Sequence, residues 1–446
     1  MKRDSFGSQL GTLMALIGSA VGLGNLWKFP YMAGSNGGAV FILIYIGFMF
    51  LLCLPLMLSE FIIGRRSHSN PVGAFRKLSP GSPWYLTGAL GVITAFIILS
   101  FYLVVGGWTV KYLILSIQSG FSPSFDAANQ FSSFVESPFS PVLMFLIFLG
   151  ATVAILWTGV KNGIEKYSKI LMPLLFLMIF VLAIFAINLP NAQKGLEFMF
   201  KPDWSVVTPK VILNALGQGL FSLSLGMGIV ITYSSYMNKA ENLTRVAIVT
   251  IIMDLIFALL AGLVILPSVF SFGFDPAEGP GLLFIILPQV FAQMPGGTIF
   301  AIVFFCVLII AAITSAISLL EVVISYLTEE RKISRKKALI LSSSALLITG
   351  TVCSLSLGLL SDFRIFGNNI FDFFDRITSS YMMPIGAFFI ALFVGWKMPK
   401  PDVKDEMING GKLKVKWFAV FLFLVRYFVP LAILAIFLNQ SGIFQI

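Results

Sequence analysis

The chain has 446 residues, of which 58% are hydrophobic and 11% are charged. Because a soluble globular chain is roughly 45–50% apolar and about 25% charged, this composition indicates an integral membrane protein. The formal net charge of +10 would suggest nucleic acid as the partner of a soluble protein. Here the basic residues gather in alternate loops between apolar runs, so we expect a lipid bilayer as partner and no nucleic acid.

About eleven apolar runs of roughly 20 residues or more follow one another, each long enough to span a hydrocarbon core of about 30 Å. The sequence therefore predicts an all-α polytopic membrane protein with about 11 transmembrane helices. The predicted spans are residues 10–31, 38–64, 85–118, 140–158, 165–190, 210–236, 243–272, 297–328, 336–360, 370–397 and 415–438.

The distribution of Lys and Arg predicts the orientation of the chain. The stretch "SGFSPSFDAANQFSSFVESP" after the third run contains neither residue, and the other poor loops alternate with rich ones. Cytoplasmic loops carry the excess of basic residues, so we expect a cytoplasmic N-terminus, and an odd number of spans puts the C-terminus outside. The basic residues cluster within 2–3, 65–77, 161–169, 239–245, 331–337 and 397–416.

The connection 274–296 contains "GLLFIILPQVFAQM", which is apolar yet too short to cross a bilayer. It predicts a short helix, either re-entrant or lying on the surface, or an ordinary loop helix packed on the bundle.

Two runs are interrupted by paired glycines. The first contains "GSAVGLGNLWKFP", with Gly22 and Gly24, and the sixth contains "GQGLFSLSLGMGIV", with Gly226 and Gly228. Glycine also allows close helix packing in membranes, which is the alternative explanation for either pair alone. Interruptions five spans apart favour two halves of inverted topology around a binding site at the membrane midplane. We therefore predict a 5+5 inverted repeat with broken helices 1 and 6, in which 1–190 and 210–397 are the repeats and 415–438 is an extra C-terminal span.

A broken membrane helix exposes backbone groups that protein, water or a ligand must satisfy. The freed carbonyl groups of one half-helix suit a cation, and the freed N–H groups of the next half-helix suit an anion. A site that offers both suits a zwitterion together with a metal ion.

Side-chain oxygens that suit a hard cation lie in the eighth run. In "AAITSAISL", the spacing places one set of residues on a single helix face. Uncharged hydroxyl and carbonyl oxygens favour Na⁺ over Mg²⁺ or Ca²⁺. The alternative is that the hydroxyls bond back to their own helix. The face comprises Ala311, Thr314, Ser315, Ser318 and Leu319.

Asp254 lies within the apolar stretch "TIIMDLIFALL". An ionisable residue inside a span is costly in lipid and predicts a functional site. Glu60 and Glu321 lie nearer predicted span ends, and for them we expect structural hydrogen bonds.

The segments "GLGNLWKFP", "NGGAVFILIY", "PLMLSEFIIG", "GIEKYSKILMP", "GQGLFSLSLGMG", "ITYSSY" and "ITSAIS" together resemble the bacterial branch of the neurotransmitter:sodium symporter family. The likeness covers nearly the whole chain. Broken helices and inverted repeats are this family's known architecture, so the glycine pairing and the resemblance are not independent. The resemblance implies a multi-pass protein of the bacterial inner (cell) membrane.

The resemblance implies two sodium sites. The first would use the Ala20 carbonyl, Asn25, Ser222 and Asp254, together with the substrate carboxylate. The second would use the carbonyls of Gly18, Val21 and Ala311 with the hydroxyls of Thr314 and Ser315.

The resemblance also implies an amino acid site next to the first sodium. The ammonium group would meet Ser224 and the backbone near Ala20 and Phe221, and the carboxylate would meet the amides of Leu23 and Gly24. The full set expected to bind substrate is Ser19, Ala20, Leu23, Gly24, Ile98, Tyr102, Phe221, Ser222, Ser224, Met227, Ser315 and Leu319.

Two gates are implied on either side of this site. Tyr102 and Phe221 would close the pocket from outside. Lys28 with Asp375 would form the outer charged gate. Lysine stands where the family usually has arginine and lacks its planar bidentate geometry, so this gate is expected to be looser, with Asp372 as a competing partner. The inner gate would consist of Arg3 with Glu329 and Phe6 near Tyr236.

Asp254 replaces the asparagine that binds sodium in many family members, and Ala258 stands where animal members bind chloride through a serine. A fixed carboxylate supplies the negative charge that chloride would bring, so we expect chloride-independent transport. We also expect Asp254 to take a proton when sodium leaves.

The predicted function is sodium-coupled import of hydrophobic or aromatic L-amino acids by alternating access. Glycines around the adaptable Met227 leave room for a large side chain. The alternatives are a proton-coupled amino acid transporter and a non-transporting amino acid sensor or channel. The sequence shows no nucleophile–base set, metal cluster or cofactor motif, so we expect no enzyme.

Overall fold

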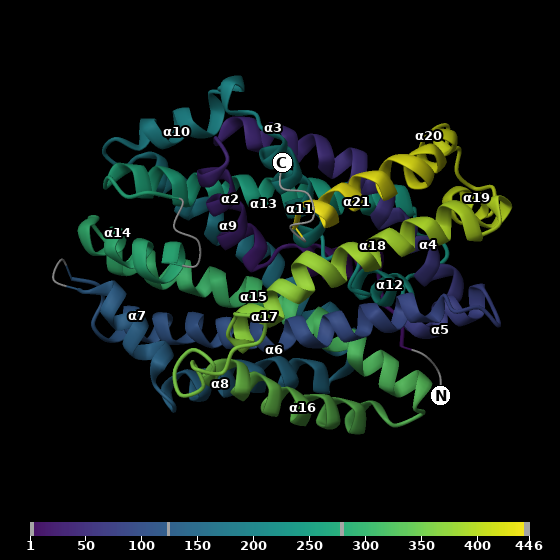
Figure 1. Cartoon of the computed structure of the whole chain (residues 1–446), viewed down its shortest axis with the longest axis horizontal. Coiled ribbons are helices and arrows are strands. Elements are labelled where there is room, and N and C mark those ends of the chain that lie inside the picture. The colour runs from purple at the N-terminus through teal and green to yellow at the C-terminus, as the bar shows by residue number, and fades with distance from the viewer. Residues whose placement is uncertain (1–3, 123–124, 277–280, 441–446) are drawn as a thin grey trace.

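The structure is a computed structural model, and it describes residues 4–122, 125–276 and 281–440. In these ranges the chain is helical, without any strand beyond an isolated bridge between Ile365 and Asn368. Figure 1 shows many of the long helices running lengthwise through the molecule, with α5 and α19 at one end and α7, α10 and α14 at the other. We call these the α19 end and the α10 end.

The first half of the chain forms twelve helical elements, including three π-helical turns labelled η. They are α1 (Gln9–Ala20), η1 (Gly24–Lys28), α2 (Phe29–Ser35), α3 (Ala39–Phe48), η2 (Met49–Cys53), α4 (Leu54–Ser67), α5 (Pro71–Leu78), α6 (Tyr85–Gln118), α7 (Ala127–Glu136), α8 (Ser140–Trp157), η3 (Val160–Glu165) and α9 (Lys166–Ile187).

The second half continues in the same way through a 3-10 turn, η4, and further π-helical turns. Its elements are α10 (Ala192–Phe200), η4 (Trp204–Val206), α11 (Pro209–Ser222), α12 (Ile229–Ser234), α13 (Leu243–Ser271), η5 (Leu282–Ile286), α14 (Leu287–Gln293), α15 (Gly297–Glu330), α16 (Arg335–Leu355), α17 (Ile370–Ile377), η6 (Thr378–Met382), α18 (Met383–Leu392), η7 (Phe393–Lys397), α19 (Lys400–Ile408), α20 (Phe418–Phe423), η8 (Leu424–Phe428) and α21 (Val429–Gln440).

The structure confirms the predicted fold class. Within the described residues, nine helices are long and apolar enough to cross a membrane, and the bent pair α1 and η1–α2 makes ten. The predicted sixth span is the broken pair α11 and α12, separated by residues 223–228. Every predicted span thus corresponds to a helical segment, while the division into two repeats at 190 and 210 stays a prediction.

The first predicted break is present. The segment Gln9–Ala20 meets Gly24–Ser35 at a bend of 46°. At the end of α1, Val21 leaves the helical conformation with φ −75° and ψ 103°. The Gly22 N–H, freed by the break, donates to the side-chain oxygen of Asn25 at 3.2 Å. A polar side chain inside the membrane therefore replaces a lost helical hydrogen bond.

The second predicted break is also present and depends on left-handed backbone. Ser224, Gly226 and Gly228 have φ of 55°, 80° and 78°. A Cβ built on Gly226 would lie 2.4 Å from the Met383 carbonyl oxygen, so only glycine fits there. The Gly226 N–H donates to Glu60 Oε1 at 2.8 Å, which is the structural hydrogen bond expected of Glu60.

The apolar stretch in 274–296 forms η5 and α14. Residues Leu282, Phe284, Leu287 and Phe291 of this helix are buried. The helix packs against α15, α13 and α7, so it is a loop helix packed on the bundle at the α10 end (Figure 1).

Candidate functional site

The two breaks and two long helices enclose a small cavity of about 30 Å³. Pockets for drug-sized ligands measure about 300–1,000 Å³, so this cavity is closed to a ligand of that size. The lining comprises all twelve residues predicted to bind substrate, together with Gly22 and Ile229: Ser19, Ala20, Gly22, Leu23, Gly24, Ile98, Tyr102, Phe221, Ser222, Ser224, Met227, Ile229, Ser315 and Leu319.

Part of the lining of this cavity is apolar and tightly packed. Ile98, Met227 and Leu319 are all buried. A Cβ built on Gly24 would lie 3.1 Å from the Phe221 ring, and one built on Gly22 would lie 2.5 Å from Ser315 Oγ. Glycine at both positions therefore lets the first break approach α11 and α15 closely.

Polar contacts tie the first break to α6 and to the second break. The Leu23 N–H lies within hydrogen-bond reach of the Tyr102 hydroxyl oxygen, at 3.5 Å. The Ser224 hydroxyl donates to the Ser19 carbonyl at 2.9 Å. Freed backbone N–H and carbonyl groups thus line the same cavity, and such groups bind carboxylate and ammonium ions respectively.

A buried polar cluster centred on Asp254 lies next to this cavity. The Asn25 Nδ2 donates to Asp254 Oδ1 at 2.8 Å and lies 3.1 Å from Ser222 Oγ. The Ser222 hydroxyl lies 3.0 and 2.9 Å from the two carboxylate oxygens. Asn25, Ser222 and Asp254 are 0%, 2% and 0% exposed. The structure therefore brings together the three side chains expected at the first sodium site.

A fourth member of this cluster, Tyr45, was not predicted from the sequence. The Tyr45 hydroxyl donates to Asp254 Oδ2 at 3.3 Å, and Tyr45 is 1% exposed on α3. Asn25, Ser222 and Tyr45 carry no formal charge, so the Asp254 cluster has a net negative charge when Asp254 is ionised. A buried carboxylate surrounded by neutral oxygens suits a hard cation.

The residues expected at the second sodium site lie where α1 meets α15. A Cβ built on Gly18 would lie 3.4 Å from Thr314 Cβ. The Thr314 hydroxyl is 3.1 Å from the carbonyl oxygens of Ile310 and Ala311 in its own helix. Val21, three residues after Gly18, and Ala311, three residues before Thr314, are fully buried. Ser315 lines the cavity between the breaks.

Ser318 was predicted to share a helix face with Thr314 and Ser315, but its side chain makes other contacts. Its hydroxyl donates to the Thr314 carbonyl at 2.9 Å and accepts from the Tyr233 hydroxyl at 2.9 Å. It therefore links α15 to α12 and takes no part in the cavity.

The outer charged gate differs from the expected one. The Lys28 ammonium lies over the Phe221 ring, 4.2 Å from its centroid. Among the described residues no direct ion pair joins it to Asp375 or Asp372, although Lys28 and Asp375 attract each other at longer range. Both aspartates are exposed, and Asp372 accepts from Asn369 Nδ2 at 2.7 Å. Lysine carries a compact point charge on a flexible stem and lacks the bidentate geometry by which arginine fixes a carboxylate.

The inner gate is only partly described, because Arg3 lies outside the described residues. Glu329 accepts from the Asn70 N–H at 2.8 Å. Phe6 is 3% exposed and packs edge-on against Tyr236, with ring centroids 5.9 Å apart. The expected contact between Phe6 and Tyr236 is therefore present.

Glu321 makes the structural contacts that its sequence position favoured. It accepts from the Tyr236 hydroxyl at 2.8 Å and pairs with both terminal nitrogens of Arg335, at 2.8 and 2.6 Å.

A second cavity, of about 900 Å³, opens at the α19 end and was not predicted from the sequence. Tyr236 and Glu329 of the inner gate line it together with Arg335 and Asp4. Two residues predicted for the inner gate therefore lie at this polar cavity.

The family model described as "Sodium:neurotransmitter symporter family" matches residues 3–133 and 128–445. The chain belongs to this family. The predicted resemblance is therefore confirmed, and the chain is a sodium-dependent transporter of this family and not an enzyme.

Relatives extend this similarity over the full length. The chain is 42% identical to the uncharacterized sodium-dependent transporter YhdH of Bacillus subtilis (strain 168), covering 99% of this chain and 98% of the relative. It is 38% identical to a sodium-dependent transporter of Haemophilus influenzae, covering 98% of each. The crystal structure of MhsT in complex with L-phenylalanine shares 43% identity and a TM-score of 0.91, covering 98% of this chain and 100% of MhsT.

Proposed function

We propose that this transporter imports hydrophobic or aromatic L-amino acids together with sodium by alternating access. The observation that supports this most strongly is the cavity between the two breaks. It places freed backbone groups beside an apolar wall formed by Ile98, Met227 and Leu319. The similar protein MhsT, solved with L-phenylalanine, supports the same class of substrate.

Two sodium ions would travel with the substrate. The first would bind at the Asp254 cluster with the Ala20 carbonyl. The second would bind where the carbonyls of Gly18, Val21 and Ala311 meet the hydroxyls of Thr314 and Ser315. Because Thr314 now bonds to its own helix, its hydroxyl hydrogen would stay there while the oxygen lone pair faces the ion.

Transport would not require chloride, because Asp254 supplies a fixed negative charge next to the first ion. When that ion leaves, the buried carboxylate would take a proton and carry it outward.

The α19 end would face the cytoplasm of a bacterium, as the basic loops predict, and the large cavity there would be the inner exit.

Thermal stability of the purified protein tests this proposal. Each of the twenty L-amino acids is added in sodium chloride and again in choline chloride. A ligand that binds the folded protein raises the midpoint temperature of thermal unfolding, and the size of this shift depends on the ligand concentration relative to Kd. We expect shifts from large apolar and aromatic amino acids in sodium only.

The variant Gly24→Ala places a methyl group 3.1 Å from the Phe221 ring and is expected to abolish the shift. Its matched control is Gly47→Ala on α3, where an added Cβ meets nothing within 4 Å. Shifts in choline equal to those in sodium would favour proton coupling. Shifts only from glycine or serine would overturn the proposed substrate class.

A further inference from the structure

The first turns of α1 are held at the α19 end by two acidic side chains from opposite parts of the sequence. Glu165, where η3 ends, accepts from the Gly7 N–H at 2.6 Å and from the Ser8 hydroxyl at 2.8 Å. Glu241, in the connection between α12 and α13, accepts from the Thr12 hydroxyl at 3.1 Å. Neither acid was singled out as a functional residue from the sequence.

The glycine at position 11 lets the Glu165 carboxyl group lie directly against α1. A Cβ built on Gly11 would lie 2.3 Å from the Glu165 carboxyl group. Ser8, which Glu165 contacts, also caps α1 by accepting the Gly11 N–H at 3.1 Å. Glu165 therefore holds the start of the helix through both its cap and its backbone.

The contact with Glu241 is fully buried. Thr12 is 0% exposed and Glu241 is 2% exposed. The same Glu241 oxygen, Oε1, accepts the Asn238 N–H at 3.2 Å, which fixes the side chain against its own connection. A buried hydrogen bond to a carboxylate contributes more than an exposed one, and without Thr12 the Oε1 atom of Glu241 would keep only the Asn238 N–H as donor.

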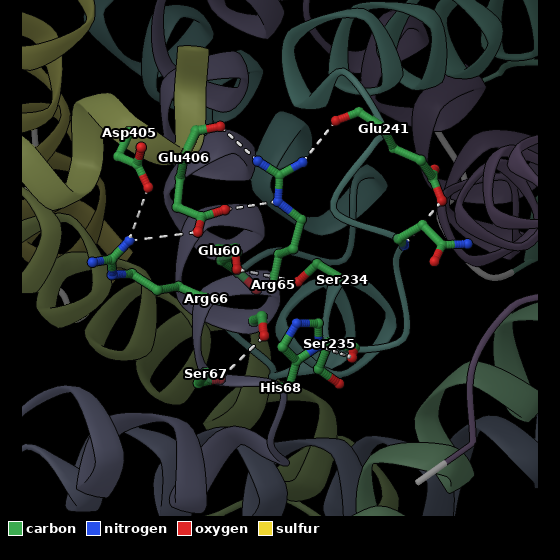
Figure 2. A network of polar contacts seen from close by, with 12 residues as sticks. Glu60, Arg65, Arg66, Ser67, His68, Ser234, Ser235, Glu241, Asp405 and Glu406 are labelled. Atoms are coloured by element: carbon green, nitrogen blue, oxygen red, sulfur yellow. Dashed lines mark hydrogen bonds and ion pairs between the residues drawn. The ribbon is translucent and has the colours of Figure 1, made fainter. Parts of the chain in front are cut away.

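Arg65 holds this connection in place from the other side. Its guanidinium donates to the Glu241 backbone carbonyl at 2.7 Å, and to Glu406 Oε2 and the Glu406 carbonyl at 2.7 and 2.5 Å. Figure 2 shows the guanidinium between Glu406 and Glu241. Arg65 is 1% exposed and joins the end of α4, the connection between α12 and α13, and α19.

We propose that Glu165 and Glu241 form a clamp on α1, that Arg65 is the positioning residue of this clamp, and that the Thr12–Glu241 bond must break before the α19 end opens. This inference rests on the proposed alternating access. The hinge would be Val21 and Gly22, which are not helical, because the 46° bend there leaves α1 without helical continuity to η1.

Amide hydrogen exchange of the full-length protein in detergent tests the clamp, read at peptides that cover α1. Thr12→Val keeps the shape of the side chain and removes the donor. We expect α1 to exchange about tenfold faster in this variant, as expected for the loss of a hydrogen bond to a charged acceptor. Thr152→Val is the matched control, because Thr152 is equally buried and donates to the Phe148 carbonyl of its own helix.

Glu241→Ala provides a second, independent variant. It removes the carboxylate but keeps the backbone carbonyl that Arg65 holds, so the connection stays anchored. We expect faster exchange of α1 in this variant too, and no further increase when Thr12→Val is added, because Glu241→Ala already removes the bond to Thr12. Additive effects, or unchanged exchange in both single variants, would overturn the clamp.

The wild type measured in sodium and in choline separates this failure from failure of the proposed function. In one outcome, sodium slows the exchange of α1 in the wild type and both variants exchange at the wild-type rate. This result would reject the clamp and support alternating access. In the other outcome, sodium does not change the exchange of α1 in the wild type, and both variants exchange faster. This result would support the clamp as a contact of the closed state and reject opening controlled by sodium.

Discussion

Asn25 and Asp254 are 229 residues apart in sequence, and the Asn25 amide donates to Asp254 Oδ1 at 2.8 Å. One residue belongs to the turn that follows the first break, and the other lies in the middle of α13. Because the Asn25 oxygen also accepts the Gly22 N–H, the asparagine stabilises the break and orients the carboxylate at the same time.

The charge of Asp254 leads to the first prediction. Uptake by the wild type is expected to continue unchanged when gluconate replaces chloride, because the carboxylate supplies the charge. Asp254→Asn keeps the hydrogen-bonding shape and removes the charge, so its remaining uptake should depend on chloride. Uptake of a radiolabelled hydrophobic amino acid into proteoliposomes measures the chloride dependence of the wild type and of the variant. Chloride dependence of the wild type would contradict the prediction.

Tyr45 leads to the second prediction. Tyr45→Phe removes the hydroxyl that lies 3.3 Å from Asp254 Oδ2. Losing a hydrogen bond of about 1 kcal/mol should weaken sodium activation about five-fold while the fold is retained. The control is Tyr112→Phe, because the buried Tyr112 hydroxyl has no hydrogen-bond partner within the described part of the chain. Equal sodium activation of the wild type and both variants would remove Tyr45 from the site.

Gly226 leads to the third prediction. Gly226→Ala introduces a Cβ at φ 80°, where left-handed backbone costs about 1–2 kcal/mol, and also 2.4 Å from the Met383 carbonyl oxygen. We expect a loss of about 2 kcal/mol or more, seen as a lower melting midpoint in detergent. Gly150→Ala on α8, where a Cβ meets nothing within 4 Å, should leave the midpoint unchanged or raise it slightly. A stable Gly226→Ala variant would mean that the second break can rearrange.

The fourth prediction concerns pH. Burial raises the pKa of Glu241 above its ordinary value, opposed by its bonds to Asn238 and Thr12 and by Arg65, and reinforced by Glu165. The folded state therefore binds this proton more tightly than the unfolded state. The stabilisation is complete below the ordinary pKa of about 4.3 and is lost as pH rises through the raised value.

We accordingly expect the melting midpoint of the wild type to fall as pH rises through that window. Glu241→Gln, which cannot titrate, should remove this part of the pH dependence. The same slope in the variant and the wild type would assign the effect to other acids.

The sequence predicted the two breaks well because each depends on local chemistry. Gly226 and Gly228 adopt left-handed backbone that few other residues accept, and Asn25 supplies an oxygen to the freed amide of Gly22. Helical spacing put Ser315 and Leu319 on one face of the eighth run, and the family resemblance placed them at the substrate pocket, where both line the cavity.

The contacts that the sequence could not predict join distant segments. Tyr45 stands among apolar residues in "AVFILIYIGF" and reads as an ordinary membrane aromatic, since its partner Asp254 lies 209 positions away. Lys28 was expected to pair with Asp375, but a flexible lysine stem allows its ammonium to rest over Phe221 instead.

The position of Thr12 on α1 makes the clamp sensitive to small rotations. The helix has 12 residues and is about 18 Å long at 1.5 Å per residue. Thr12 lies about 13 Å from residue 21, so a tilt of about 10° there would move it by about 2 Å, enough to break a hydrogen bond. Ser19 and Ala20, close to the pivot, would hardly move. The α1 helix would then act as a lever: its N-terminal end would separate from Glu241 while the residues beside the cavity keep their positions.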